Sequence, residues 1–65
     1  MKHYQVIVYG DKGVDSYELK KYNDILAENE KEAEDTALRL APDDIAYNTY
    51  IHYQSFSANV ISWRD

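Results

Sequence analysis

Three features of the sequence predict an α+β fold in which a single helix packs on a small antiparallel sheet. Residues 3–9 alternate between two partly apolar faces, as a strand does. Residues 29–42 begin with a capping signal and end at a proline, which is typical of a short helix. Residues 45–56 are dense in β-branched and aromatic side chains, which favour strands. We therefore expect one domain, residues 1–65, with the element order β-β-α-β-β.

The first two expected strands form a hairpin. Residues 3–9 are the first strand, and the glycines of "GDKG" supply the positive φ values for a turn at residues 10–13. The second strand runs through residues 17–27. Its polar stretch "KKYND" predicts a bulge or break near residues 20–23. A short helical turn over residues 15–21 is the alternative for this segment.

The expected helix has a marked start and a marked end. Asn29 is placed to accept from the N–H groups of the first turn, and Glu32 stands three residues on, as in a capping box. Pro42 offers no N–H and disfavours helical backbone at the residue before it, so we expect the helix to stop there. The helical period predicts an apolar side that packs on the sheet and consists of Ala33, Ala37, Leu40 and Ala41, with Leu38 at its margin.

The rest of the chain is expected to supply two more strands. Residues 45–56 form the first of them, with Tyr47 on one face and Tyr50 on the other. The segment "SAN", residues 57–59, turns the chain, and "VISW", residues 60–63, closes the sheet.

The negative charge of the chain is concentrated in one segment. Residues 24–44 carry eight acids and two bases, a net charge of −6, whereas the remainder carries four acids and five bases, a net charge of +1. A protein that binds nucleic acid directly shows the opposite sign, so we expect no such binding. The chain has no cysteine, and its start lacks the apolar run of a signal peptide or a membrane span. A cytoplasmic protein is the expectation.

No catalytic, cofactor or metal site is expected from the residue pattern. His3 and His52 have no ligand-type neighbours at the spacing of a metal site. The segment "DKGVDSYE" lacks the glutamate of a calcium loop, and Gly10 and Gly13 lack the context of a phosphate loop. We therefore expect a protein that is not an enzyme.

The seven tyrosines exceed what a small core needs. One interpretation is a sheet whose exposed face is covered with amphipathic rings. The other is a protein interface, where tyrosine is enriched because it offers much contact area for few torsions. If the helix covers one face of the sheet, the other face is either wet or paired, so both a monomer and a homodimer fit the sequence.

The opening strand "MKHYQVIVYG", the segment "ILAENEKEAEDTALRLAP" and the β-rich second half together resemble small phage and mobile-element proteins. Some of these proteins inhibit host machinery, including small anti-CRISPR proteins and a phage inhibitor of bacterial RNA polymerase. The resemblance implies a protein that binds and blocks a large host complex, and acidic members of such groups occupy a groove meant for nucleic acid.

The hypothesis is therefore a non-catalytic acidic inhibitor that occupies the basic groove of a host protein or ribonucleoprotein complex as a nucleic-acid mimic. Basic grooves attract an acidic body over a long range. The alternative is an interaction module of a mobile element that binds protein through a tyrosine-rich sheet, as a monomer or a homodimer. The expected partner-binding residues are Glu28, Glu30, Glu32, Glu34, Asp35, Asp43, Asp44, Tyr47 and Tyr50.

Overall fold

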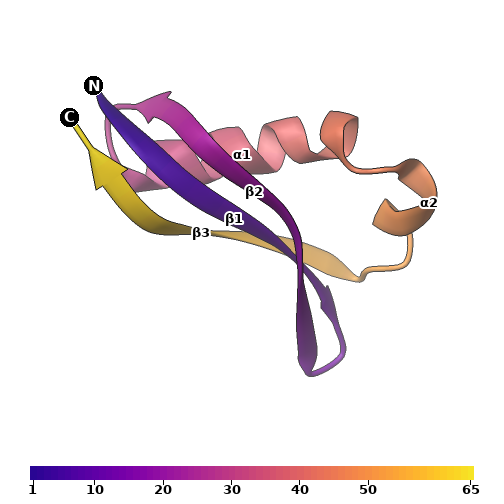
Figure 1. Cartoon of the computed structure of the whole chain (residues 1–65). Coiled ribbons are helices and arrows are strands. Elements are labelled where there is room, and N and C mark those ends of the chain that lie inside the picture. Colours follow the sequence, from indigo (N-terminus) through magenta and orange to yellow (C-terminus); the bar gives the residue numbers. More distant parts are fainter.

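The computed structural model describes the backbone of residues 1–65 and every side chain except that of Tyr47. Its elements are β1 (Lys2–Lys12), β2 (Asp15–Ala27), α1 (Glu30–Asp44), α2 (Tyr47–Tyr50) and β3 (Ser55–Arg64). The strands form one antiparallel sheet in the order β2-β1-β3, and α1 packs across one face of it (Figure 1). Both termini lie at the end of the sheet where α1 begins (Figure 1). The α+β class with one main helix on an antiparallel sheet is confirmed.

The predicted pair of strands after the helix is wrong. Residues 47–50 are helical, and the backbone N–H groups of Thr49 and Tyr50 each donate to the carbonyl of Ala46 at 2.9 Å. One strand, β3, follows and runs straight through "SAN", where Ala58 lies opposite Val8 of β1. This segment therefore makes backbone hydrogen bonds locally, and the Tyr50 ring stacks on Phe56 of β3. Tertiary packing overrides strand propensity here.

The hairpin is confirmed, but its two glycines have different roles. Gly13 has a φ of 65° and makes the turn. Gly10 is a buried residue of β1, and a Cβ at this position would lie 2.6 Å from the Tyr53 ring. Residues 15–21 are strand, which excludes the helical turn. The predicted bulge is also confirmed, because register shifts leave one extra residue of β2 at Leu19 and another at residues 23–24.

Helix α1 begins where the sequence predicts and ends later. The Oδ1 atom of Asn29 accepts from the N–H of Glu32 at 2.8 Å, which confirms the cap. Pro42 lies inside the helix, which continues to Asp44, and the N–H of Ile45 donates to the carbonyl of Ala41 at 2.9 Å. A proline this near the end removes one helical hydrogen bond from a turn that is about to finish, so the predicted stop at Pro42 is wrong.

The main core lies between α1 and the sheet. It consists of Tyr4, Val6, Val8, Ile25, Ala27, Ala33, Ala37, Ala41 and Ile45. Leu38 packs at its margin as predicted, but Leu40 is 39% exposed and does not belong to it. The buried alanines let the helix approach the strands closely, because each side chain is a single methyl group.

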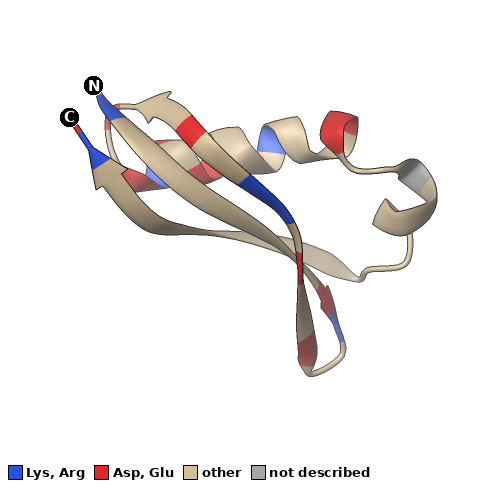
Figure 2. Cartoon of the chain, viewed as in Figure 1, with Lys and Arg blue, Asp and Glu red and all other residues tan. Residues whose placement is uncertain are grey.

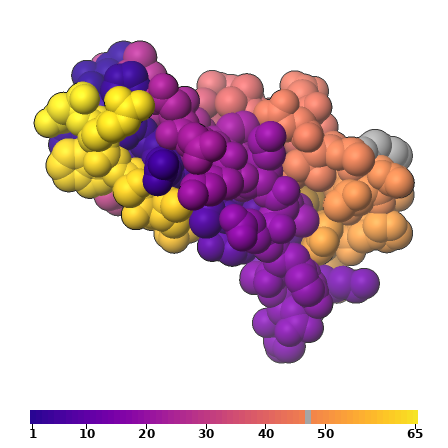
Figure 3. All heavy atoms as spheres, viewed as in Figure 1, coloured from indigo at the N-terminus to yellow at the C-terminus, as the bar shows by residue number. Residues whose placement is uncertain are grey.

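A second cluster of side chains lies where α2 meets the hairpin, and we call it the aromatic cluster. Its rings are Tyr17, Tyr50, Tyr53 and Phe56. The Tyr50 and Phe56 rings stack with centroids 4.0 Å apart, and the Tyr53 ring meets Phe56 edge-on. Beyond this cluster the tip of the hairpin stands out from the body (Figure 3).

Candidate partner-binding surface

We give the name acidic end to four exposed carboxylates: Glu30 and Glu32 in the first turn of α1, Glu28 just before the helix, and Asp65 just after β3. Glu28 follows Ala27, which pairs with Lys2, and Asp65 follows Arg64, which pairs with His3, so both lie at the same end of the sheet as Tyr4. Burial of the ring, together with the charges, raises the pKa of Tyr4 above its ordinary value. Segments 28–32 and 65, far apart in the sequence, thus meet at one end of the molecule.

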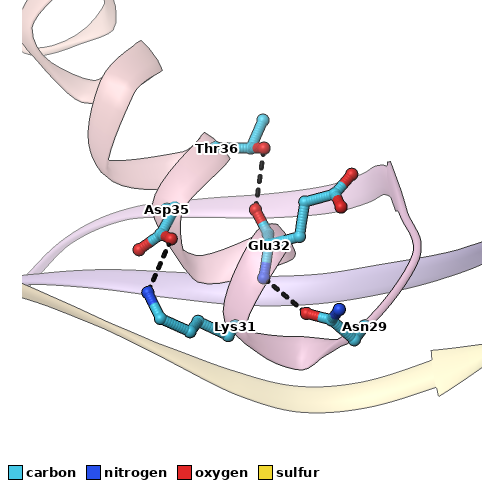
Figure 4. A network of polar contacts seen from close by, with 5 residues as sticks. All are labelled: Asn29, Lys31, Glu32, Asp35 and Thr36. Carbon is cyan, nitrogen blue, oxygen red and sulfur yellow. Dashed lines mark hydrogen bonds and ion pairs between the residues drawn. The ribbon is translucent and has the colours of Figure 1, made fainter.

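Two further predicted acids lie on α1 beyond the acidic end, and both have partners within the chain. The Lys31 ammonium donates to Asp35 at 2.9 Å, an exposed pair one helical turn apart (Figure 4). The backbone N–H of Val60 donates to Glu34 at 3.4 Å. Since β3 is an edge strand, Glu34 covers a donor that would otherwise be open to pairing with another chain.

The last two predicted acids lie at the opposite end of α1. The Tyr22 hydroxyl donates to Asp44 at 2.6 Å and so ties the end of the helix to β2. Burial and this hydrogen bond raise the pKa of Tyr22 above its ordinary value, and the charges of Asp44 and Asp43 add to the effect. Asp44 therefore has a structural role, while Asp43 is exposed.

The acidic residues are thus divided between two ends of one helix and do not form a continuous line. Fifteen residues of helix at 1.5 Å each separate these ends by about 20 Å. Asp and Glu, drawn in red, lie at both ends of α1, and Lys and Arg, drawn in blue, lie between them (Figure 2). No member of the acidic end has an ion-pair partner among the described residues, and the same holds for Glu34, Asp43 and Asp44.

The two predicted tyrosines belong to a different region. The side chain of Tyr47 lies outside the described residues. Tyr50 is half-buried on α2 and stacks on Phe56 in the aromatic cluster. The structure therefore does not bring Tyr50 together with the acidic end.

The face of the sheet opposite α1 is open. Neighbours in the ladder share a face, so His3, Gln5, Ile7 and Tyr9 of β1 lie on this side, and each is half-buried. Tyr4 is one of the buried residues of β1, so its side chain points to the helix side. Tyr17 and Tyr22 of β2 lie opposite other buried residues of β1, so their side chains point the same way. Tyr9 is the one tyrosine of the described strands on the open face, so a tyrosine-rich sheet face is not what the fold presents.

Sequence reasoning missed Trp63. It lies directly opposite Tyr4 in the ladder, and its side chain is 51% exposed. The Lys2 ammonium lies 3.9 Å from the centre of the Trp63 ring. The only signal in the sequence was a tryptophan near the end of a strand, and nothing there placed it beside the start of the helix.

The described residues hold no group of three or more metal-ligating side chains, and the part of the chain that the structure describes has no pocket. Among its helices, none is long and apolar enough to cross a membrane. Comparison of the chain with protein-family models, curated proteins and solved structures gave no match.

Proposed function

We propose that this protein is a non-catalytic acidic inhibitor, of the anti-CRISPR type, that binds the basic nucleic-acid groove of a host protein or ribonucleoprotein complex in the cytoplasm. The observation that carries the proposal is the acidic end, where Glu28, Glu30 and Glu32 are exposed and lack ion-pair partners among the described residues. Partner-free carboxylates keep their full charge available to a cationic surface.

The shape of the molecule fits this role. A groove that holds nucleic acid is lined with Lys and Arg, and such a surface attracts a negative body before contact. The acidic end lies at one extremity of an elongated domain (Figures 1 and 2), so it enters a groove without the rest of the protein in the way. The edges of the sheet are less suited to pairing with another strand. On β3 the backbone N–H of Val60 already donates to Glu34, and β2 contains two bulges.

A charge-neutralised variant tests the proposal. Glu28→Gln, Glu30→Gln and Glu32→Gln together keep the side-chain shapes and remove three charges. We expect binding to a purified CRISPR effector complex to slow by about tenfold or more in association rate at low salt, with a smaller loss at high salt. Surface-plasmon kinetics at two salt concentrations, with guide-matched DNA as competitor, measures this.

The matched control removes three charges from the hairpin: Asp11→Asn, Asp15→Asn and Glu18→Gln. It makes the net charge less negative by the same amount but leaves the acidic end intact, so its association rate should change far less. If the two triple variants bind alike, or if DNA does not compete, the acidic end is a solvated helix start and the proposal fails. Thermal unfolding of both variants shows whether they fold, because carboxylates in the first turn of a helix each contribute about 0.3–1 kcal/mol.

A second candidate function is a protein-interaction module that uses the open face of the sheet, in one arrangement as a homodimer. The observation that favours it is the half-buried pair Ile7 and Tyr9 at the centre of a face that no described element covers. Sedimentation of the protein over a range of concentrations tests the homodimer. Tyr9→Ala should shift the protein to monomer if this face pairs, and should leave sedimentation unchanged if it does not.

A further inference from the structure

The exposed ring of Trp63 lies beside the acidic end. Tyr4 and Trp63 are directly opposite each other on β1 and β3, so their side chains leave the sheet on the same side, toward the start of α1. Glu28 follows Ala27, the strand partner of Lys2, and Asp65 lies two residues after Trp63, so the acidic end lies at the same end of the sheet as this indole ring. An aromatic face combined with nearby carboxylates is an arrangement that attracts cations.

A cation of the chain already occupies this place. The Lys2 ammonium lies 3.9 Å from the centre of the Trp63 ring, well within the range of a cation–π contact. Lys2 lies two residues before Tyr4 on the same face of β1, on a flexible four-carbon stem. The contact can therefore open without disturbing the sheet.

The hydroxyl of Tyr4 is a second, independent feature. Tyr4 as a whole is 3% exposed, but its hydroxyl takes part in none of the side-chain hydrogen bonds among the described residues, and none of their unpartnered side-chain oxygens is buried, so the hydroxyl reaches solvent. This hydroxyl, placed among carboxylates, has acceptor lone pairs for a donor that arrives from outside.

We propose that Trp63, the Tyr4 hydroxyl and the carboxylates of the acidic end form a binding site for an arginine side chain of the partner, and that Lys2 fills this site in the free protein. The proposal rests on the proposed function and names the contact at its centre. A guanidinium is flat, so it stacks on an indole ring while its five N–H groups reach the carboxylates and the hydroxyl. An ammonium has no such plane, so arginine is preferred to lysine.

The chain of residues 1–65 tests this directly, because Trp63 is its one tryptophan. The probes are a nine-residue arginine peptide and a nine-residue lysine peptide of equal charge. We expect the arginine peptide to shift the indole N–H signal in NMR spectra and to bind about two- to fivefold more tightly than the lysine peptide. Trp63→Leu should abolish that preference. Equal binding of the two peptides, or an unmoved indole signal, overturns the proposal.

Two lysine variants give a measurement that does not depend on changing Trp63. Lys2→Ala and Lys12→Ala each remove one positive charge, but Lys12 lies at the far tip of the hairpin (Figure 1). Lys2→Ala should strengthen binding of the arginine peptide by about two- to fivefold more than Lys12→Ala does. Equal effects of the two substitutions contradict the role of Lys2 and overturn the proposal.

Binding to the effector complex separates this proposal from the proposed function. If the triple glutamine variant loses binding and Trp63→Leu does not, the acidic end is the functional surface and the arginine site is wrong. If the triple variant keeps its binding to the complex, the proposed function fails, whatever the peptides show.

Discussion

The contact between α1 and the sheet is made by small side chains on the helix, whereas the region around α2 is packed with large aromatic side chains. Under α1 the sheet meets methyl groups, and Ala33, Ala37 and Ala41 are each at most 1% exposed. Around α2 the contacts come from the rings of the aromatic cluster, and every one of those rings remains partly exposed. The alanine layer is closed and has no room for a larger group, whereas the aromatic cluster is open on one side.

This difference shows which kind of contact stabilises each part of a short chain. A domain of 65 residues buries a modest fraction of its surface, so it gains most from bringing backbones close together. Alanine on the helix and glycine on β1 permit this approach, the first under α1 and the second beneath the Tyr53 ring. The large rings then cover what the helix does not reach.

The largest expected effect comes from enlarging the alanine layer. Ala37→Leu adds three carbons at a fully buried position and should lower the free energy of unfolding by about 3 kcal/mol, because the helix must move off the sheet. Urea unfolding followed by circular dichroism measures the loss. Arg39→Leu on the exposed side of the same helix is the control, with an expected change within about 0.5 kcal/mol. Equal effects would mean that the layer is not closely packed.

The next effect should come from the glycine beneath the aromatic cluster. Gly10→Ala places a Cβ 2.6 Å from the Tyr53 ring and should lower the free energy of unfolding by about 1–3 kcal/mol. The test is a double-mutant cycle with Tyr53→Ala, since removing the ring removes the clash. The cost of Gly10→Ala should then fall to below about 1 kcal/mol. A cost that stays the same in both backgrounds would place the strain elsewhere.

A smaller effect is expected at the start of α1. Asn29→Ala removes the acceptor for the Glu32 N–H and should lower the free energy of unfolding by about 1 kcal/mol. Native-state hydrogen exchange should speed up more at the first turn of α1 than near Phe56. The cap stabilises the start of α1 and does not contact the aromatic cluster. Asn48→Ala on α2 serves as the control, since no described hydrogen bond uses its side chain. Unchanged exchange at residues 30–33 would contradict the cap.

The smallest effect concerns the link between β2 and the end of α1. Tyr22→Phe removes the hydrogen bond to Asp44 and should lower the free energy of unfolding by about 0.5–1 kcal/mol at neutral pH. Because folding raises the pKa of Tyr22 above its ordinary value of 10.0, this contribution is complete below pH 10 and is lost as the pH rises further.

The measurement for Tyr22 is urea unfolding of parent and variant at about pH 8 and about pH 11. The gap in stability between them should shrink at the higher pH, because Tyr22 then ionises in the unfolded parent while the folded parent keeps the proton, which favours the unfolded state. Tyr17→Phe is the control, because none of the described side-chain hydrogen bonds uses the Tyr17 hydroxyl. A constant gap for Tyr22→Phe would show that Asp44 does not hold the hydroxyl in solution.

Local chemistry made much of the fold predictable. The alternation in residues 3–9, the cap at Asn29 and the turn at Gly13 each depend on residues close in sequence, and all three are present. The candidate site was predicted in part, since the acidic segment was evident from composition. Its division into two ends was not, because the hydrogen bonds of Glu34 and Asp44 join residues more than twenty positions apart.

The sequence by itself determined the strands of the hairpin, the start of the helix and the net negative charge, because each follows from local propensity or from counting. Tertiary structure decided the rest. It turned residues 47–50 into a helix, since their neighbouring rings stack on Phe56 instead of joining the ladder. It also placed Trp63 opposite Tyr4 beside the acidic end, because only strand register brings the two extremities of the chain together.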